Sequence, residues 1–192
     1  MITETASRAN FIGGSEANMI YMGYDTKTFK QWWQTKIEGI DEESPQNLHM
    51  AVGTILERDV LDLHESIHGT TGERDGCSIK GIARANTDYV TNDKVSDVKV
   101  STKAQEWHKK GKVPIQYRRQ LIHYCYVLNM SQASIIAYQS SEELLNNPFI
   151  DLSENDLYEI EVEIKESDIK KHQQIIEYLE LCKENGLYPQ EG

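Results

Sequence analysis

Two N-terminal segments carry apolar residues at helical spacing. Residues 27–37 predict a helix whose core-facing side is formed by Phe29, Trp32, Trp33 and Ile37. Residues 47–67 predict a long amphipathic helix whose buried stripe is expected to be Met50, Ile55, Val60, Leu63 and Ile67. Gly69 suits the end of that helix, and Ser15, after Gly13 and Gly14, suits the N-cap of a short helix over residues 15–21.

Between residues 77 and 101 the pattern becomes that of β-strands, with the turn "TND" at residues 91–93. Pro114 suits the start of a further helix, whose apolar side would be Leu121, Tyr124, Cys125 and Leu128. Residues 133–139 predict a buried strand and residues 156–164 an alternating, half-exposed one. Ser167 is expected to cap a final helix that ends near Gly186. This order of elements predicts a mixed α/β layer structure.

The bulk composition adds a few limits. A chain of 192 residues, 39% hydrophobic and 27% charged, predicts a single domain over residues 1–192. No apolar run reaches membrane-spanning length, and the N-terminus lacks the features of a signal peptide, so we expect a cytoplasmic protein without a membrane partner. The three cysteines, Cys77, Cys125 and Cys182, are expected to be reduced thiols.

The net charge of −11 argues against nucleic-acid binding, but its distribution is uneven. Eight basic residues stand between positions 94 and 119, against only Asp97 and Glu106, whereas acids outnumber bases from Glu142 onward. An acidic molecule can therefore carry a local basic surface. We interpret the acidic C-terminal part as a solvated face.

The hairpin "NTDYVTNDKVSDVKVS", residues 86–101, predicts a cation site. Residues two apart on a strand share a face, so Asp97 and Lys99 point one way while Val98 points into the core. A turn at residues 92–93 would bring Asp88 near Asp97. Two adjacent carboxylates repel unless a cation joins them, and oxygen ligands favour Mg²⁺ or Mn²⁺. With Lys99 beside the metal, the group suits metal-assisted phosphodiester hydrolysis. An exposed cross-strand ion pair is the alternative interpretation.

A second motif, "HESIH" at residues 64–68, predicts different chemistry. His64 and His68 share a helix face with Glu65 between them, the arrangement of zinc metalloproteases. The helix is expected to end at Gly69, Thr71 stands where an extended motif has glycine, and no third ligand stands at the expected spacing. We therefore favour a surface histidine pair, with an incidental metal site and a zinc protease as alternatives.

Several segments together resemble the phage lambda-type exonucleases, or YqaJ-like viral recombinases, of the PD-(D/E)XK nuclease superfamily. In order they are "SRANFIGGSEANMI", "YDTKTFKQWWQTKIEG", "NLHMAVGTILERDVLDLHE", "ARANTDYV", "SDVKVS" and "GKVPIQYRRQLIHYCYVLNMSQASIIAY". Each is weakly specific, whereas their joint order over about residues 8–138 is specific. Residues 139–192 would complete the domain. The resemblance implies a restriction-endonuclease-like core, with a central mixed sheet flanked by helices.

The resemblance also implies roles for individual residues. Glu57, Asp88, Asp97 and the Val98 carbonyl would be metal ligands, Lys99 would position the attacking water, and Gln120 would support the site. Arg8 and Ser15 would bind the 5′-terminal phosphate, and Ser15 at a helix N-terminus suits an anion independently. Backbone contacts to DNA are expected from Lys103, Lys109, Lys110, Lys112, Arg118 and Arg119.

The implied function is a Mg²⁺- or Mn²⁺-dependent exonuclease on linear duplex ends, 5′ to 3′, in phage-type recombination. A ring-shaped homotrimer, a single-strand annealing partner and a phage or prophage origin in a bacterial host are implied with it. Two positions depart from the family pattern: Asp97 replaces the usual Glu, and Tyr89 replaces a Gly. These departures motivate one alternative, a nuclease-fold protein that has lost catalysis and acts as a DNA- or protein-binding inhibitor. A structure-specific endonuclease is a further alternative.

Overall fold

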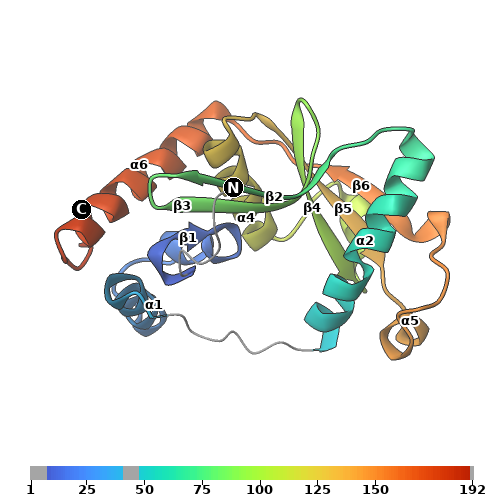
Figure 1. The fold of residues 1–192 in the computed structure, drawn as a ribbon, viewed down its shortest axis with the longest axis horizontal. Helices are drawn as coiled ribbons and strands as arrows, with labels where there is room; N and C mark the ends of the chain where they lie inside the picture. The colour runs from blue at the N-terminus through green and yellow to red at the C-terminus, as the bar shows by residue number, and fades with distance from the viewer. Residues whose placement is uncertain (1–7, 41–47, 191–192) are drawn as a thin grey trace.

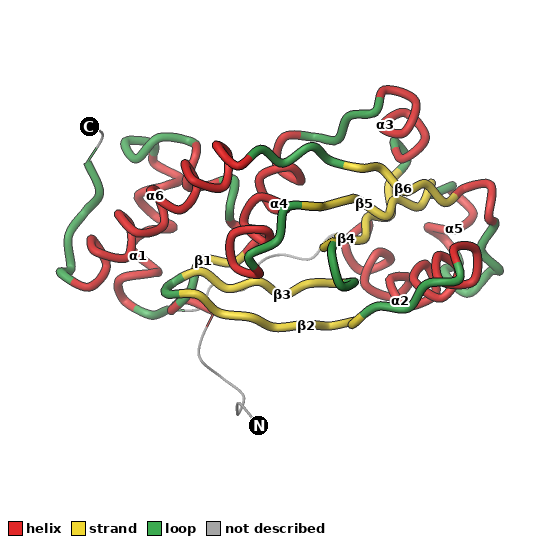
Figure 2. Tube along the Cα trace, turned by 90° about the horizontal axis from the view of Figure 1, so that it is seen from above, coloured by secondary structure: helices red, strands yellow, loops and turns green. Residues whose placement is uncertain are grey.

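The computed structural model describes residues 8–40 and 48–190 (Figures 1 and 2). Six strands form one mixed sheet in the order β1-β3-β4-β5-β6, with β2 also paired to β3. β1–β3 and β4–β5 are parallel pairs, and the others are antiparallel. The strands are β1 (Ile12–Gly13), β2 (Glu73–Lys80), β3 (Ala83–Val90), β4 (Lys94–Ser101), β5 (Gln132–Gln139) and β6 (Leu157–Glu161).

Helices cover both faces of the sheet. They are α1 (Lys27–Glu38), α2 (Leu48–His68), α3 (Ala104–Lys110), α4 (Ile115–Leu128), α5 (Glu142–Asn146) and α6 (Glu166–Glu184). Helices α3 and α4 pack on one face, where Leu121 joins Ile135 in the core. Helices α2 and α5 pack on the other, where Leu56 joins Ile136. Because Ile135 and Ile136 are neighbours on β5, the two core layers follow from the alternation of a strand buried on both faces.

A third core cluster lies at one end of the sheet, where α1 and α6 lie near each other (Figure 1). Trp33 is fully buried, and Trp32 is 8% exposed, so the sequence-based expectation that these rings pack in the core is confirmed. The side chain of Thr26 caps α1 by accepting a hydrogen bond from the backbone N–H of Phe29.

The two edges of strand β3 pair with different strands and over different lengths. One edge pairs with β2 along most of its length. The other edge pairs with β1 at residues 83–84 and with β4 only at residues 89–90. Beyond Tyr89 and Ser96, β3 and β4 diverge instead of extending their ladder, as Figure 1 shows. We call the region between these two diverging strands the notch.

The sequence predicted most long elements, and the structure corrects their details. Residues 15–21 form two 3₁₀ turns, Gly14–Glu16 and Met19–Tyr21, because the Glu16 carboxylate accepts from the N–H of Gly13 and fixes a tight turn there. The cap of α6 is Lys165, whose N–H donates to Asp168, and Ser167 lies inside the helix. β2 is a separate strand, and β1, α3 and α5 were not predicted.

The predicted stripe of α2 is also largely wrong. Met50, Ile55 and Ile67 are between 42% and 49% exposed. The helix instead buries side chains at intervals of four residues, which lie on one face and pack against the sheet. These residues are Val52, Leu56, Val60 and His64. The stripe was hard to predict because its last member is polar, and apolar residues also occupy the exposed side. α2 ends at His68, before Gly69 with φ of 63°, as expected.

Candidate functional site

The notch forms around Asp88 on β3. Where the next pair of the β3–β4 ladder would lie, the backbone N–H of Val98 donates instead to the Asp88 carboxylate, at 2.7 Å. A side chain thus takes the place of a backbone acceptor, which satisfies the amide while the strands separate. This contact holds the Asp88 carboxylate against β4, next to Asp97.

Asp97 is buried, with 1% of its surface exposed, and is held on both oxygens. The side-chain amide of Gln120 on α4 donates to Asp97 Oδ1 at 2.7 Å and to the Tyr124 hydroxyl at 2.8 Å. The other oxygen, Oδ2, forms an ion pair with Lys99 Nζ, which also lies 5.3 Å from the ring centre of Tyr117. Gln120 of the following helix therefore holds Asp97 in place, and its role in a catalytic site stays a prediction.

Glu57 reaches the same region from α2. Its charge interacts with those of Asp75, Asp97 and Lys99, which shows that the helix brings it close to the notch. A cavity of about 520 Å³ beside it is lined by Thr54, Glu57, Arg58, Leu61, Arg74 and Asp75. The structure thus gathers Glu57, Asp88, Asp97 and Lys99 in one region, although their roles in catalysis stay predictions.

The electrostatics of the notch show an excess of negative charge. Burial, and then the charge of Asp97, raises the pKa of Asp88 to about 8. Burial, followed by Asp75 and Asp97, raises the pKa of Glu57. For Lys99, burial opposes the charged form, but Asp97 and Asp88 outweigh it and raise the pKa of the ammonium. Lys99 is therefore protonated at neutral pH, and its single positive charge faces several carboxylates.

This donor set fits a hard divalent cation. Asp97 Oδ2 is buried and pairs with the Lys99 ammonium, and a carboxylate oxygen has a second lone pair, so it retains capacity for a cation. Carboxylate oxygens are the ligands that Mg²⁺ and Mn²⁺ prefer. The ligand atoms of Glu57, Asp88 and Asp97 are not all within 4.8 Å of one another, so a cation shared by all three would draw them together. The Val98 carbonyl stays a prediction as a ligand.

Asp75 is a neighbour of the site that the sequence did not reveal. It stands opposite Asp88 in the register of β2 and β3, between the pairs Arg74–Tyr89 and Gly76–Thr87. Its φ of 55° is rare for a residue other than glycine, and the ladder skips it. Asp75 has a raising effect on the pKa of Glu57, which places its carboxylate near that of Glu57. No element was predicted for residues 70–76, so nothing in the sequence marked this acid as a neighbour of the site.

Tyr89, one of the two departures from the family pattern, packs in the core. Its side chain is 1% exposed and joins the cluster under α2, with its ring 5.8 Å from that of His64. An alanine at Gly72 would place its Cβ 2.7 Å from the Tyr89 ring, so Gly72 makes room for it. Tyr89 thus has a packing role in the core.

The predicted phosphate-binding residues lie in the N-terminal segment. Ser15 is exposed within the 3₁₀ turn Gly14–Glu16, and this three-residue turn is not the helix N-terminus that was expected. Ser15 lines a small cavity of about 50 Å³ with Phe11, Gly13, Gly14, Glu16, Arg84, Asn86 and Tyr124. Gly14 is required there because a Cβ would lie 2.2 Å from the Tyr124 ring. Arg8 begins a 3₁₀ turn, and its side chain lies outside the described residues.

The six lysine and arginine side chains predicted to contact DNA have different surroundings. Arg118 forms an ion pair with Asp168 at 2.6 Å, and Arg119 donates to Asn18 and lies 4.7 Å from the Tyr21 ring centre. Lys109 and Lys110 contact side chains one turn earlier on α3. Lys103 and Lys112 are exposed, before and after that helix. Their role in DNA binding stays a prediction.

No family model and no curated protein matches the chain by sequence. In structure the chain is similar to an alkaline exonuclease from Laribacter hongkongensis, with a TM-score of 0.73 and 13% identity over 94% of this chain and 91% of that chain. The complex of that exonuclease with dAMP matches with a TM-score of 0.75 and 14% identity, at the same coverage. A phage-related exonuclease from Haemophilus somnus 129PT matches with a TM-score of 0.61 and 14% identity, over 91% and 94% of the two chains.

These similarities show the fold. The chain shares the mixed α/β architecture of these structures, with a central sheet flanked by helices, as the sequence predicts. Among the residues that the structure describes, no helix combines the length and apolarity needed to cross a bilayer. The three cysteines are free, as expected.

Proposed function

We propose that this chain is a Mg²⁺- or Mn²⁺-dependent deoxyribonuclease that removes nucleotides from the ends of linear duplex DNA. The observation that carries the proposal is the notch, where Asp88, Asp97 and Lys99 meet between diverging strands, with Glu57 nearby. The fold shared with structures described as exonucleases supports it. So does the complex of one of them with dAMP, a nucleotide.

The residues of the notch suit phosphodiester hydrolysis. Asp88, Asp97 and Glu57 would hold the cation, which when bound polarises a phosphate oxygen and acidifies a water molecule. Lys99 keeps its charge, and the Asp97 ion pair fixes its position, so it can orient the attacking water and offset charge on the phosphate. Gln120 fixes Asp97 from behind, so the carboxylate needs little reorganisation.

The finer features of the proposal come from the family resemblance. They are 5′-to-3′ direction, binding of a 5′-phosphate near Ser15, a ring-shaped trimer and an annealing partner in phage-type recombination. A ring needs a basic surface only along its lumen, so the net charge of −11 is compatible with DNA binding.

The test is nucleotide release from linear duplex carrying 5′-phosphates, with Mg²⁺ and with chelator. Lys99→Ala is expected to lower the rate by about 100- to 1000-fold, the usual effect of removing one preorganised group that stabilises the transition state. Lys30→Ala is the matched control, because Lys30 is an exposed lysine of α1 whose ammonium contacts exposed Asp25 at 3.4 Å and lies 5.9 Å from the Tyr188 ring centre. Equal rates for wild type and Lys99→Ala would refute the proposal. Cleavage of closed circular duplex would indicate an endonuclease instead.

A further inference from the structure

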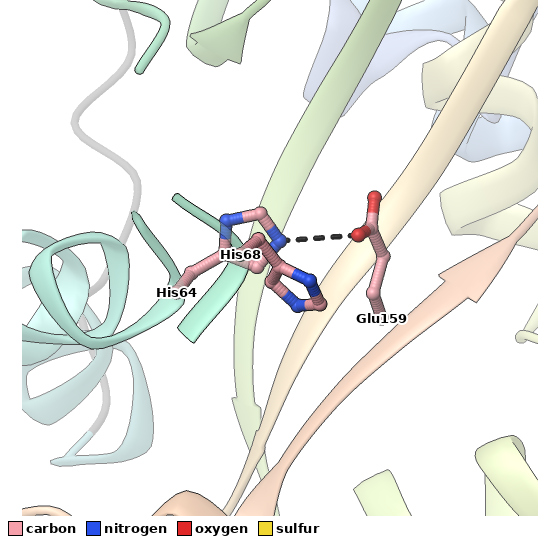
Figure 3. A group of neighbouring side chains, drawn as sticks. All are labelled: His64, His68 and Glu159. Atoms are coloured by element: carbon pink, nitrogen blue, oxygen red, sulfur yellow. Dashed lines mark hydrogen bonds and ion pairs between the residues drawn. The ribbon is translucent and has the colours of Figure 1, made fainter. Parts of the chain in front are cut away.

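A second group of metal-ligand side chains lies at the other end of α2. His64 and His68 are one helical turn apart, and their ring centres are 4.4 Å apart. Glu159 of β6 lies opposite them, with its Oε2 atom 3.1 Å from His64 Nε2 (Figure 3). One ligand atom from each residue lies within 4.8 Å of the other two. We propose that these three residues bind one late first-row divalent cation, Zn²⁺ above all, at a site separate from the notch.

The carboxylate of Glu159 is held in the orientation that such a site requires. Its Oε1 atom accepts a hydrogen bond from Ser134 Oγ at 2.8 Å and forms an ion pair with Lys94. The other oxygen, Oε2, therefore faces the histidines. Ligands fixed by neighbouring groups in this way are typical of functional metal sites. Lys94 also pairs with Glu161 at 2.9 Å, so its charge is shared between two carboxylates and the local charge before metal binding stays negative.

The burial of the three residues fits a site that is open on one side. His64 is 4% exposed, whereas His68 is exposed at the end of the helix. The Nδ1 atom of His64 is buried without a hydrogen-bond partner among the described residues, whereas its Nε2 atom faces Glu159, so Nε2 is the nitrogen that would bind the cation. Ligand atoms around tetrahedral Zn²⁺ lie roughly 3.4 Å apart, so binding would draw the three ligand atoms closer together, mainly by movement of the exposed His68. The fourth position would face solvent.

The ligand types select the metal. Two imidazole nitrogens and one carboxylate oxygen suit Zn²⁺, Co²⁺ or Ni²⁺, whereas Mg²⁺ prefers oxygen ligands and keeps several waters. The notch offers carboxylates and no histidine, so its preference is the opposite. The two groups are about 10 Å apart along α2, measured by the helical rise between Glu57 and His64. This inference therefore does not depend on the proposed nuclease activity.

The structure argues against the zinc protease to which the "HESIH" motif pointed. Glu65, which would be the general base, accepts hydrogen bonds from the backbone N–H of Gly72 at 3.2 Å and from Arg74 at 2.6 Å. Both of its oxygens are thus engaged with the chain after the helix. A bound cation would instead join α2 to β6. It would thereby hold α2, the helix that also carries Glu57, against the sheet.

The test uses the full chain without a histidine tag, after chelator treatment, titrated with Co²⁺ and then Zn²⁺. The wild type is expected to bind one Co²⁺ with the strong visible absorption of nitrogen-rich tetrahedral sites, which Zn²⁺ abolishes and excess Mg²⁺ does not. His68→Ala should weaken the binding by more than about 100-fold, because loss of a ligand exceeds the usual effect of losing a group that only orients one. His108→Ala, a change at an exposed histidine of α3, should bind as the wild type does.

Any Co²⁺ bound in the notch would be common to all three proteins and cancels in the comparison. X-ray absorption of the zinc-loaded wild type gives a readout that needs no variant, and two imidazole ligands are expected. The absence of a tight Co²⁺ site, equal affinity in His68→Ala and wild type, or a zinc spectrum without imidazole would each overturn the proposal.

Discussion

Two groups of potential metal ligands meet α2, about two helical turns apart, and they differ in chemistry and in how they are built. The notch assembles carboxylates and one ammonium where two strands diverge. The group of His64, His68 and Glu159 joins the end of a helix to strand β6 and already has its carboxylate oriented. If both proposals hold, one helix contributes to a site for a hard cation near Glu57 and to a site for a nitrogen-preferring cation at its end.

The comparison also shows how far a short motif can be trusted. Asp-x-Lys is a common pattern, yet Asp97 and Lys99 lie in a built site because β3, α2 and α4 all contribute side chains to it. His-Glu-x-x-His is a more specific pattern, yet Glu65 binds Arg74 and cannot serve as the base. In both cases the deciding feature is a partner on another element, Asp88 of β3 for the first motif and Glu159 of β6 for the second.

The largest expected effect separates the two groups by a change at Asp88. Asp88→Asn should lower nuclease activity by at least about 1000-fold, because it removes the central carboxylate of the notch. Its Co²⁺ affinity at the histidines should equal that of the wild type. Loss of both properties would mean that the two groups are not independent, and retention of nuclease activity would contradict the role of Asp88.

The same variant makes a prediction about stability and pH. The pKa of Asp88 is about 8 in the folded chain and roughly 3.9 when unfolded, so between these values the folded state holds a proton that the unfolded state has lost. This difference in bound protons makes the folded, metal-free wild type less stable as the pH rises from about 4 to 8. Asp88→Asn lacks this difference, and near pH 9 it should melt at least about 3 °C above the wild type.

The comparison is made on metal-free protein by thermal unfolding across the pH range. The melting-temperature difference should shrink toward acid pH. Asp59→Asn, on an exposed acid of α2, should show a difference that does not change with pH. A pH-independent difference for Asp88→Asn would show that the carboxylate is not under electrostatic strain.

A smaller effect is expected at Glu57, at the edge of the notch. Glu57→Gln keeps the shape of the side chain and removes the charge, so activity should fall about 10- to 100-fold and more Mg²⁺ should be needed for half-maximal rate. Asp59→Asn removes one charge from the same helix and should leave both quantities unchanged. Measuring rate against Mg²⁺ concentration for the two variants tests this, and an equal response would remove Glu57 from the site.

Gln120 should have a positioning effect of about tenfold on activity. Gln120→Ala removes the donor to Asp97 Oδ1, so a buried carboxylate oxygen loses its partner, and the free energy of unfolding should fall by about 1–3 kcal/mol. Gln116→Ala, one turn earlier on α4 and exposed, is the control. Urea unfolding and rate measurements belong together here: a loss of stability without loss of activity would restrict Gln120 to a structural role.

The smallest effect is expected at Glu65. Glu65→Gln weakens the ion pair with Arg74, so the free energy of unfolding should fall by about 0.5–1 kcal/mol. Cobalt affinity should stay within about twofold of the wild type, because this carboxylate faces the chain after the helix and orients no ligand. A large loss of affinity would show that the residue belongs to the metal site after all.

Much of the fold could be predicted from the sequence because its long elements carry regular periodicity. The two Trp rings of α1, the buried strand β5 and the β3–β4 hairpin all follow from local patterns and are where they were expected. The buried face of α2 was predicted wrongly because His64, a polar residue, is part of it, and the partner of His64, Glu159, is distant in the chain. The prediction of Ser15 as a helix N-cap was wrong, because the Glu16 carboxylate accepts the hydrogen bond from the Gly13 N–H at this turn.

The candidate site was predictable only in part. The proximity of Asp88 and Asp97 follows from a turn at residues 92–93, whereas the sequence carries no signal for the divergence of the strands or for the contact from Val98 N–H to Asp88 that accompanies it. Asp75 could not be found from the sequence because a positive φ and a skipped ladder position place it. Glu57 and Gln120 were found only through the family resemblance, since neither residue carries a local signal.

The most direct test of the account is anomalous diffraction from crystals of the full chain soaked with Mn²⁺ and Zn²⁺ together, recorded at the absorption edge of each metal. We expect manganese between Asp88 and Asp97 in the notch and zinc at His64, His68 and Glu159. Manganese that avoids the carboxylates of the notch, while the protein is folded and the metal is in excess, would contradict the central claim that the notch is a hard-cation site for phosphodiester hydrolysis.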